Sequence, residues 1–207
     1  MRLELVTAPT VEPLTAAEAK ARLGIDAEVA DATMESFIKA ARQTIDGRDG
    51  WLGRALNTQI WKLLLPGFPC EPIRVPLPPL ISVGSVKYYD LAGDLQSVEA
   101  SDYRILAGAR PEIVSTGSWP SAACRTDAVE ITFTAGYGAA GSDVPEPIRS
   151  AIALMVSNLR SMSARNLFVS QEVEEGIGST SYVVGGNAGA AINAAVNALL
   201  STYRVFA

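Results

Sequence analysis

The sequence predicts an α+β fold: a helical bundle with an inserted small β-sandwich or meander domain and a C-terminal tethered helix. Apolar residues recur every three or four positions before about residue 51 and again after Pro145. Between Asn57 and Ala135 they alternate in short runs that prolines and glycines separate. We therefore expect an N-terminal helical part (1–56), an inserted β domain (57–138), a core helix completing the helical domain (139–165), and a flexible tail with a C-terminal amphipathic helix (166–207).

Two helices are expected near the N-terminus. Thr15 and Glu18 have the spacing of a capping box, and Gly24 closes the short helix that follows. Asp31 caps a second helix, whose apolar residues at helical spacing predict one buried face. These residues are Met34, Phe37, Ile38, Ala41 and Ile45. The stretch Asp46-Gly-Arg-Asp-Gly50 interrupts this pattern, and we interpret it as a polar linker.

The middle of the chain predicts short strands. The run 60–65 is apolar on one face and mostly apolar on the other, as expected of a central strand, whereas the prolines of 71–80 suit a sheet edge. Residues 83–106 predict a meander with a hairpin turn at Leu91-Ala-Gly-Asp94. Trp119, in the loop 115–127, either marks a contact surface or closes one end of the sandwich, and we favour the second interpretation.

A strand and a helix meet at the end of the β region. Alternation over Ala128-Val-Glu-Ile-Thr-Phe-Thr-Ala135 predicts a half-buried strand that Gly136 ends. Pro145, Glu146 and Pro147 suit the first turn of a helix, where a missing N–H costs nothing and a carboxylate complements the helix dipole. The following residues are apolar over a wide arc, so we expect this helix to be largely buried.

The tail contains a Gly/Ser-rich stretch and then an apolar stripe at helical spacing. The stripe consists of Ile192, Val196, Leu199, Leu200 and Tyr203. Because the tether cannot offset the entropy of ordering, we expect this helix to be detached and buried by a partner. The alternative is that it folds back on its own subunit.

Composition argues against several function classes. The net charge of −5 is unlike the basic footprint of nucleic-acid-binding proteins. The chain has no histidine, which removes the commonest general base and zinc ligand, and its two cysteines are expected to be free thiols. Paired carboxylates (Asp90 and Asp94; Glu172, Glu174 and Glu175) are interpreted as turns or solvated charges. We therefore expect no enzyme, cofactor, metal or membrane segment, and a soluble protein made in the cytoplasm.

Four stretches in order carry a resemblance to a known family. They are "PLTAAEAKARLGID", "GRALNTQIWKLLLPGFP", "IRVPLPPLISVGSVKYYD" and "AVEITFTAGYG...DVPEPIRSAIALMV". Together they resemble the head-tail connector (adaptor) proteins of long-tailed phages and gene transfer agents. The resemblance implies a structural neck protein of the virion, found in the host cytoplasm before assembly. It implies a self-assembled ring, twelvefold in our expectation, that joins the portal protein to a tail-side stopper or tail terminator protein while DNA passes through the lumen without specific binding.

The resemblance supplies no catalytic residue, and it suggests the portal as the partner of the stripe in the tail. The alternative is a non-catalytic β-sandwich module that binds a carbohydrate or a peptide. That alternative would need a cluster of exposed aromatic side chains, for which the sequence offers Tyr88, Tyr89 and Trp119.

Overall fold

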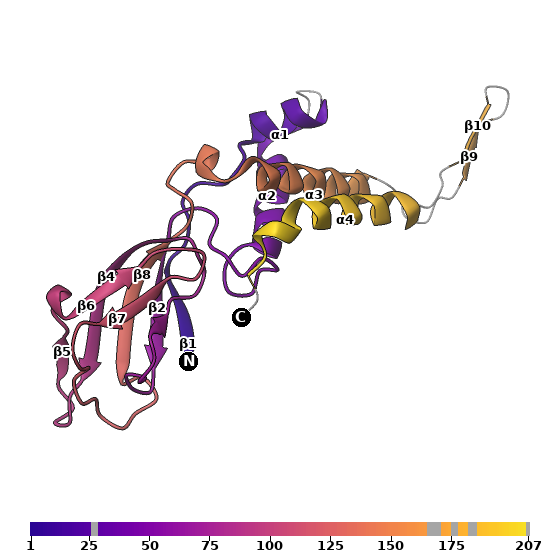
Figure 1. Ribbon diagram of the computed structural model, residues 1–207. Coiled ribbons are helices and arrows are strands. Elements are labelled where there is room, and N and C mark those ends of the chain that lie inside the picture. The colour runs from indigo at the N-terminus through magenta and orange to yellow at the C-terminus, as the bar shows by residue number, and fades with distance from the viewer. Residues whose placement is uncertain (26–28, 165–170, 175–177, 182–185, 206–207) are drawn as a thin grey trace. The chain divides into compact units, whose positions relative to one another are not determined.

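The computed structural model describes residues 1–25, 29–164, 171–174, 178–181 and 186–205 (Figure 1). The chain is α+β, as predicted, and it divides into two compact units. The β unit consists of Met1–Pro13, Gln43–Val144 and Arg204–Ala207, and the helical unit of Leu14–Arg42 and Pro145–Tyr203. The predicted boundary at residue 56 therefore differs from the division in the structure, because residues on both sides of the first two helices belong to the β unit.

Two antiparallel sheets form the β unit. The larger sheet has the strand order β1-β2-β8-β4-β5 and the smaller sheet the order β3-β7-β6. The strands of the larger sheet are β1 (Arg2–Thr7), β2 (Gln59–Leu65), β8 (Val129–Ala135), β4 (Leu80–Tyr89) and β5 (Leu95–Ser97). Those of the smaller sheet are β3 (Ile73–Arg74), β7 (Glu112–Ser115) and β6 (Tyr103–Leu106). Two further strands, β9 (Gln171–Glu174) and β10 (Gly178–Ser181), pair antiparallel with each other. Both belong to the residues of the helical unit.

Strand β8 is at the centre of the β unit (Figure 1). Its alternating pattern places Val129, Ile131 and Phe133 on one face, and all three are fully buried. They belong to the same hydrophobic cluster as Ile73 and Ile113 from the smaller sheet. The two sheets therefore share one core, which holds the strand edges and the loops between them in place.

One predicted pairing was wrong. The meander was expected to continue from β5 to β6, but β6 pairs with β7, with Tyr103 opposite Ser115 and Ile105 opposite Ile113. Pairing with β7 places Ile113 in the shared core, where it is fully buried. Between β5 and β6, the 3-10 turn η1 (Ala100–Asp102) carries the chain from one sheet to the other.

The helical unit contains α1 (Ala16–Leu23), most of α2 (Asp31–Ile45), α3 (Glu146–Ala164) and α4 (Gly186–Leu200). The predicted capping box is present: the Thr15 hydroxyl accepts from the Glu18 N–H at 3.2 Å, and the Thr15 N–H donates to Glu18 Oε2 at 2.9 Å. Gly24 ends α1 with φ of 60°. Local signals thus set the start and the end of this helix.

Ion pairs join α1 to α3 within the helical unit. Arg149, only 8% exposed, donates to Glu18 Oε1 at 2.6 Å and to Glu146 Oε2 at 3.0 Å. Arg22 also pairs with Glu146. The hydrogen bond from the Thr15 N–H and then the contact with Arg149 lower the pKa of Glu18, and the hydrogen bond from Arg22 lowers that of Glu146. Both carboxylates therefore favour the charged form in the folded state.

Helix α4 packs along α3 in the helical unit (Figure 1). This differs from the expectation of a detached helix on a tether. Val196 and Leu200 of α4 are buried, whereas its alanines from Ala190 onward are exposed. Parts of the predicted Gly/Ser tether, at 165–170, 175–177 and 182–185, lie outside the described residues.

Candidate interaction surfaces

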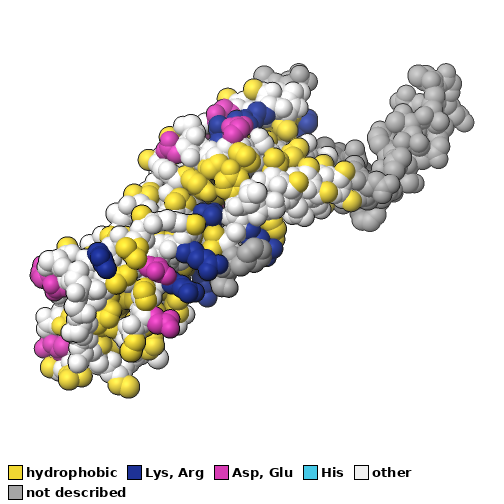
Figure 2. All heavy atoms as spheres, viewed as in Figure 1, with side chains coloured by type: hydrophobic (Ala, Val, Ile, Leu, Met, Phe, Trp, Pro, Cys, Tyr) yellow, Lys and Arg dark blue, Asp and Glu magenta, His cyan; other side chains and the backbone are white. Residues whose placement is uncertain are grey.

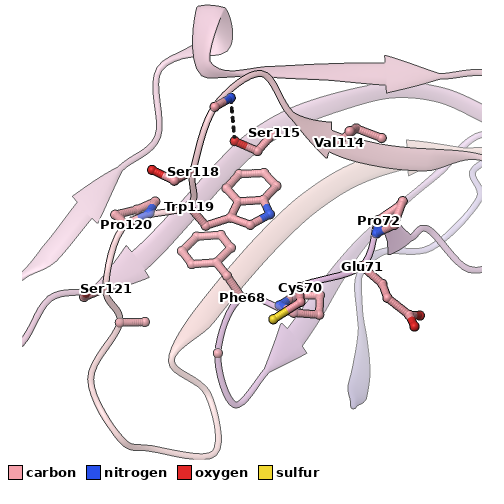
Figure 3. Close-up of a pocket in the computed structure, with 14 residues that line it drawn as sticks. Phe68, Cys70, Glu71, Pro72, Val114, Ser115, Ser118, Trp119, Pro120 and Ser121 are labelled. Atoms are coloured by element: carbon pink, nitrogen blue, oxygen red, sulfur yellow. Dashed lines mark hydrogen bonds between the residues drawn. The ribbon is translucent and has the colours of Figure 1, made fainter.

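A groove of about 630 Å³ lies in the β unit, between the loops that follow β2 and β7 (Figure 3). Phe68, Cys70 and Glu71 line it from the first loop, and Ser118 and Trp119 from the second. The Gly117 N–H donates to Ser115 Oγ at 3.2 Å and fixes the start of the second loop. The groove thus combines aromatic, proline and hydroxyl groups with one carboxylate.

Aromatic side chains form the floor of this groove. The rings of Phe68 and Trp119 stack with centroids 4.6 Å apart and an interplanar angle of 6°, as Figure 3 shows. Tyr88 meets Phe68 edge-on at 5.8 Å. All three are partly buried and pack on the shared core, so Trp119 is not an isolated exposed side chain. Because Phe68 covers one face of the indole, that face is closed to a sugar ring.

The groove is lined by one thiol, one carboxylate and several serine hydroxyls. Cys70 and Cys124 are free and exposed, as predicted. In the described part of the chain, no group of three His, Cys, Asp or Glu side chains could hold a metal ion. Among these same residues, no helix is long and apolar enough to cross a membrane.

Asp90, one of the carboxylates singled out in the sequence, has a structural role. Asp90 Oδ1 accepts from the N–H groups of Ala92 and Asp94 at 2.9 and 3.0 Å, and Oδ2 accepts from Gln96 Nε2 at 2.9 Å. The hydrogen bond from Gln96, followed by those from the turn, lowers the pKa of Asp90. Asp90 thus fixes the β4-β5 turn, as its interpretation as a turn residue predicted. Glu175 and the side chains of Glu172 and Glu174 lie outside the described residues.

The five apolar residues of the tail have different surroundings. Val196 and Leu200 are 8% and 1% exposed, so they belong to the interior of the helical unit. Ile192, Leu199 and Tyr203 are half-buried and keep part of their surface. After Tyr203 the chain joins the β unit, where the Val205 N–H donates to the Leu52 carbonyl at 2.9 Å and Arg204 lies over the Trp51 ring at 4.6 Å.

Large hydrophobic side chains are exposed mainly on the β unit. They are Met1, Leu5, Val6, Val11, Ile81, Leu91, Leu95, Ile105 and Leu106. On the visible face of this unit, basic and acidic side chains both lie among hydrophobic ones (Figure 2). Several of the exposed residues occur on strands at the edges of the two sheets. Sequence periodicity did not predict this, because it does not tell which strands are outermost.

Solved gene transfer agent (GTA) particles contain chains with this fold. A chain in the virion of the native GTA particle is 26% identical with a TM-score of 0.71, over 100% of this chain and 97% of that chain. A chain in the neck of an empty GTA particle, computed with C6 symmetry, gives the same values. The predicted resemblance to head-tail connectors is confirmed.

A third similarity agrees with the connector fold. A chain in the neck of the native GTA particle, computed with C12 symmetry, has a TM-score of 0.64, 22% identity, and the same coverage of 100% and 97%. At that identity the similarity shows the fold alone. No protein-family model and no curated protein matches the sequence of this chain.

Proposed function

We propose that this chain is a non-enzymatic structural adaptor that forms a ring in the neck of a phage or phage-like particle. The observation that carries the proposal is the likeness to chains of the GTA virion and neck over the full length of this chain, at 26% identity. The symmetries of the neck structures, C6 and C12, support a ring of copies, twelvefold in our proposal. The two units would then be the predicted helical bundle and its inserted β-sandwich.

In this proposal the ring joins the portal protein to a tail-side stopper or tail terminator protein, and DNA passes through its lumen. The net charge of −5 supports a lumen that does not hold DNA, because neutralisation of phosphates by basic side chains is what drives non-specific binding. The isolated protein should therefore show no salt-sensitive binding to duplex DNA. Tight binding that weakens steeply with salt would count against this arrangement.

We retain α4 and the 3-10 turn after it, η3 (Ser201–Tyr203), as the candidate portal contact, with fewer residues than the five predicted. Ile192, Leu199 and Tyr203 keep exposed surface that a partner could cover, whereas Val196 and Leu200 hold the helix in its own unit. Ile192→Asp should reduce attachment to portal-bearing heads with little effect on stability. Val196→Asp should instead unfold the helical unit, since it would bury an unpaired charge.

The direct test is to locate the protein in particles. Quantitative mass spectrometry of purified particles should find it at a fixed ratio to the portal protein, near one to one for a twelvefold ring on a twelvefold portal. Electron microscopy of particles with the protein tagged should place the label at the neck. Absence from particles, together with binding of a carbohydrate or a peptide in the groove at Phe68 and Trp119, would favour the ligand-binding alternative.

A further inference from the structure

Exposed apolar side chains lie on or beside both outermost strands of the larger sheet. In the described residues, β1 pairs only with β2, and β5 pairs only with β4. Leu5 and Val6 on β1 are 48% and 54% exposed, and we call them the β1 edge. Leu91 and Leu95, on the turn before β5 and on β5 itself, are 78% and 46% exposed, and we call them the β5 edge. Figure 1 shows the two strands at opposite sides of the β unit.

Edge strands of this kind are usually protected from pairing with another strand. An outermost strand presents backbone N–H and C=O groups that a further strand can pair with, and proteins usually protect it with charge, proline or a bulge. The first half of β1 has such protection, since it carries Arg2 and Glu4, and the Leu3 carbonyl accepts from Arg48 Nη1 at 3.2 Å. Near Leu5 the register with β2 shifts, but Leu5 and Val6 themselves are large and apolar. Single exposed apolar residues are ordinary, whereas apolar residues beside unpaired backbone are typical of a strand-to-strand contact.

The β5 edge is held in a fixed conformation. The Asp90 carboxylate accepts from the Ala92 and Asp94 N–H groups and from Gln96, so the turn that carries Leu91 is preorganised. Gly93, with φ of 91°, supplies the left-handed residue that the turn requires. Little conformational entropy would therefore be lost when another molecule covers Leu91.

Opposite edges fit a head-to-tail contact between copies. In a closed ring each subunit uses one face toward the neighbour on one side and a different face toward the neighbour on the other. In a ring of twelve, successive subunits are rotated by about 30°, so these faces must point in nearly opposite directions. The two edges of one sheet meet this condition, and an unrelated partner would require only one of them.

We propose that the β1 edge of one subunit contacts the β5 edge of the next subunit in the ring. This inference rests on the ring of the proposed function and specifies the surface through which it closes. The occupant of each edge is thus a second copy of this chain.

Disulfide trapping tests the contact directly. In a Cys70→Ser, Cys124→Ser background, Leu5→Cys and Leu95→Cys are introduced together. Three strands separate these positions within one sheet, a distance of roughly 19 Å, which is too far for a disulfide inside one subunit. Oxidation of purified particles should give a ladder of covalent multimers. Either cysteine alone should give none, and dimers from Leu5→Cys alone would overturn the proposal because they would show a symmetric β1-to-β1 contact.

A charge at the edge gives an independent measurement. Leu5→Glu should lower the amount of protein in particles by about tenfold or more, since the carboxylate would be buried at the contact. The matched control is Ile81→Glu, because Ile81 is also 48% exposed but lies at the start of β4, outside the β1 edge and the β5 edge. Circular dichroism and the unfolding midpoint of both variants should match those of the unsubstituted chain, so that a folding defect is excluded.

The outcomes separate the two proposals. If the unsubstituted protein is present in particles but gives no ladder, and Leu5→Glu is incorporated normally, the edge contact is overturned and the adaptor function stands. If the unsubstituted protein is absent from particles, both are overturned. Equal losses for Leu5→Glu and Ile81→Glu would also overturn the edge contact, because the effect would not be specific to the β1 edge.

Discussion

Replacement of Asp46 by alanine should destabilise the β unit strongly, although Asp46 begins the stretch 46–50 that we interpreted from sequence as a polar linker. Asp46 is 8% exposed and lies at the end of α2. Its Oδ1 accepts from the Leu56 N–H at 2.9 Å and from Gln59 Nε2 at 2.8 Å. Gln59 Oε1 in turn accepts from Trp61 Nε1 at 3.1 Å. One carboxylate thus connects the end of a helix to the start of β2.

The expected magnitude follows from the donors that lose their acceptor. Leu56 and Gln59 are 0% and 2% exposed, so water does not reach the freed N–H groups without a change in packing. A buried donor without an acceptor costs about 1–3 kcal/mol, so two such donors cost about 2–6 kcal/mol. At about 2–4 °C per kcal/mol for a chain of this size, the melting temperature should fall by roughly 4–24 °C.

Urea unfolding followed by tryptophan fluorescence measures this loss, and Trp61 reports on the network itself. Asp49→Ala is the matched control, because the Asp49 side chain is 98% exposed in the same stretch. Asp46→Asn should lie between the two, since its amide oxygen can still accept from one donor. A loss below about 1 kcal/mol for Asp46→Ala, or an equal loss for Asp49→Ala, would refute the reasoning.

Three further predictions concern single contacts. Arg149→Met should destabilise the helical unit by about 1–3 kcal/mol, less than for a fully buried pair because Glu18 and Glu146 are 45% and 58% exposed. The folded-state pKa values of Glu18 and Glu146 are depressed, so their stabilisation is present above the ordinary value of 4.5 and is lost as pH falls through the folded values. The acid limb of a stability profile should therefore be slightly shallower in Arg149→Met and clearly shallower in Arg22→Met, because the hydrogen bond from Arg22 is the largest cause of the lowered pKa of Glu146. An unchanged limb in Arg22→Met would contradict the role of these ion pairs. Thr15→Ala should cost about 1 kcal/mol through loss of the capping box, with Ser36→Ala as a comparison outside a helix cap. Gly136→Ala should cost about 3 kcal/mol or prevent folding, because φ is +132° and a Cβ would lie 2.4 Å from the Asn57 carbonyl oxygen; Gly117→Ala, with open space around it, should be nearly neutral in the same thermal melts.

The sequence was sufficient to predict elements whose signals are local. The capping box at Thr15 and the glycine at Gly24 bound α1, and the prolines at 145 and 147 precede the long apolar run of α3. Alternation alone predicted β8 and its buried face. Asp90 and Gly93 likewise predicted the β4-β5 turn. Such signals depend on a few neighbouring residues, since periodicity and capping are properties of the backbone within one or two turns.

Tertiary structure decided what depends on residues far apart in the chain. No local pattern states that β6 pairs with β7, that β1 and β5 are outermost in their sheet, or that Asp46 is buried. The apolar stripe of α4 predicted that the helix must be covered, but not that α3 covers it. Many different surfaces could bury an apolar stripe. Which of them does so is decided only when the whole chain folds around its core.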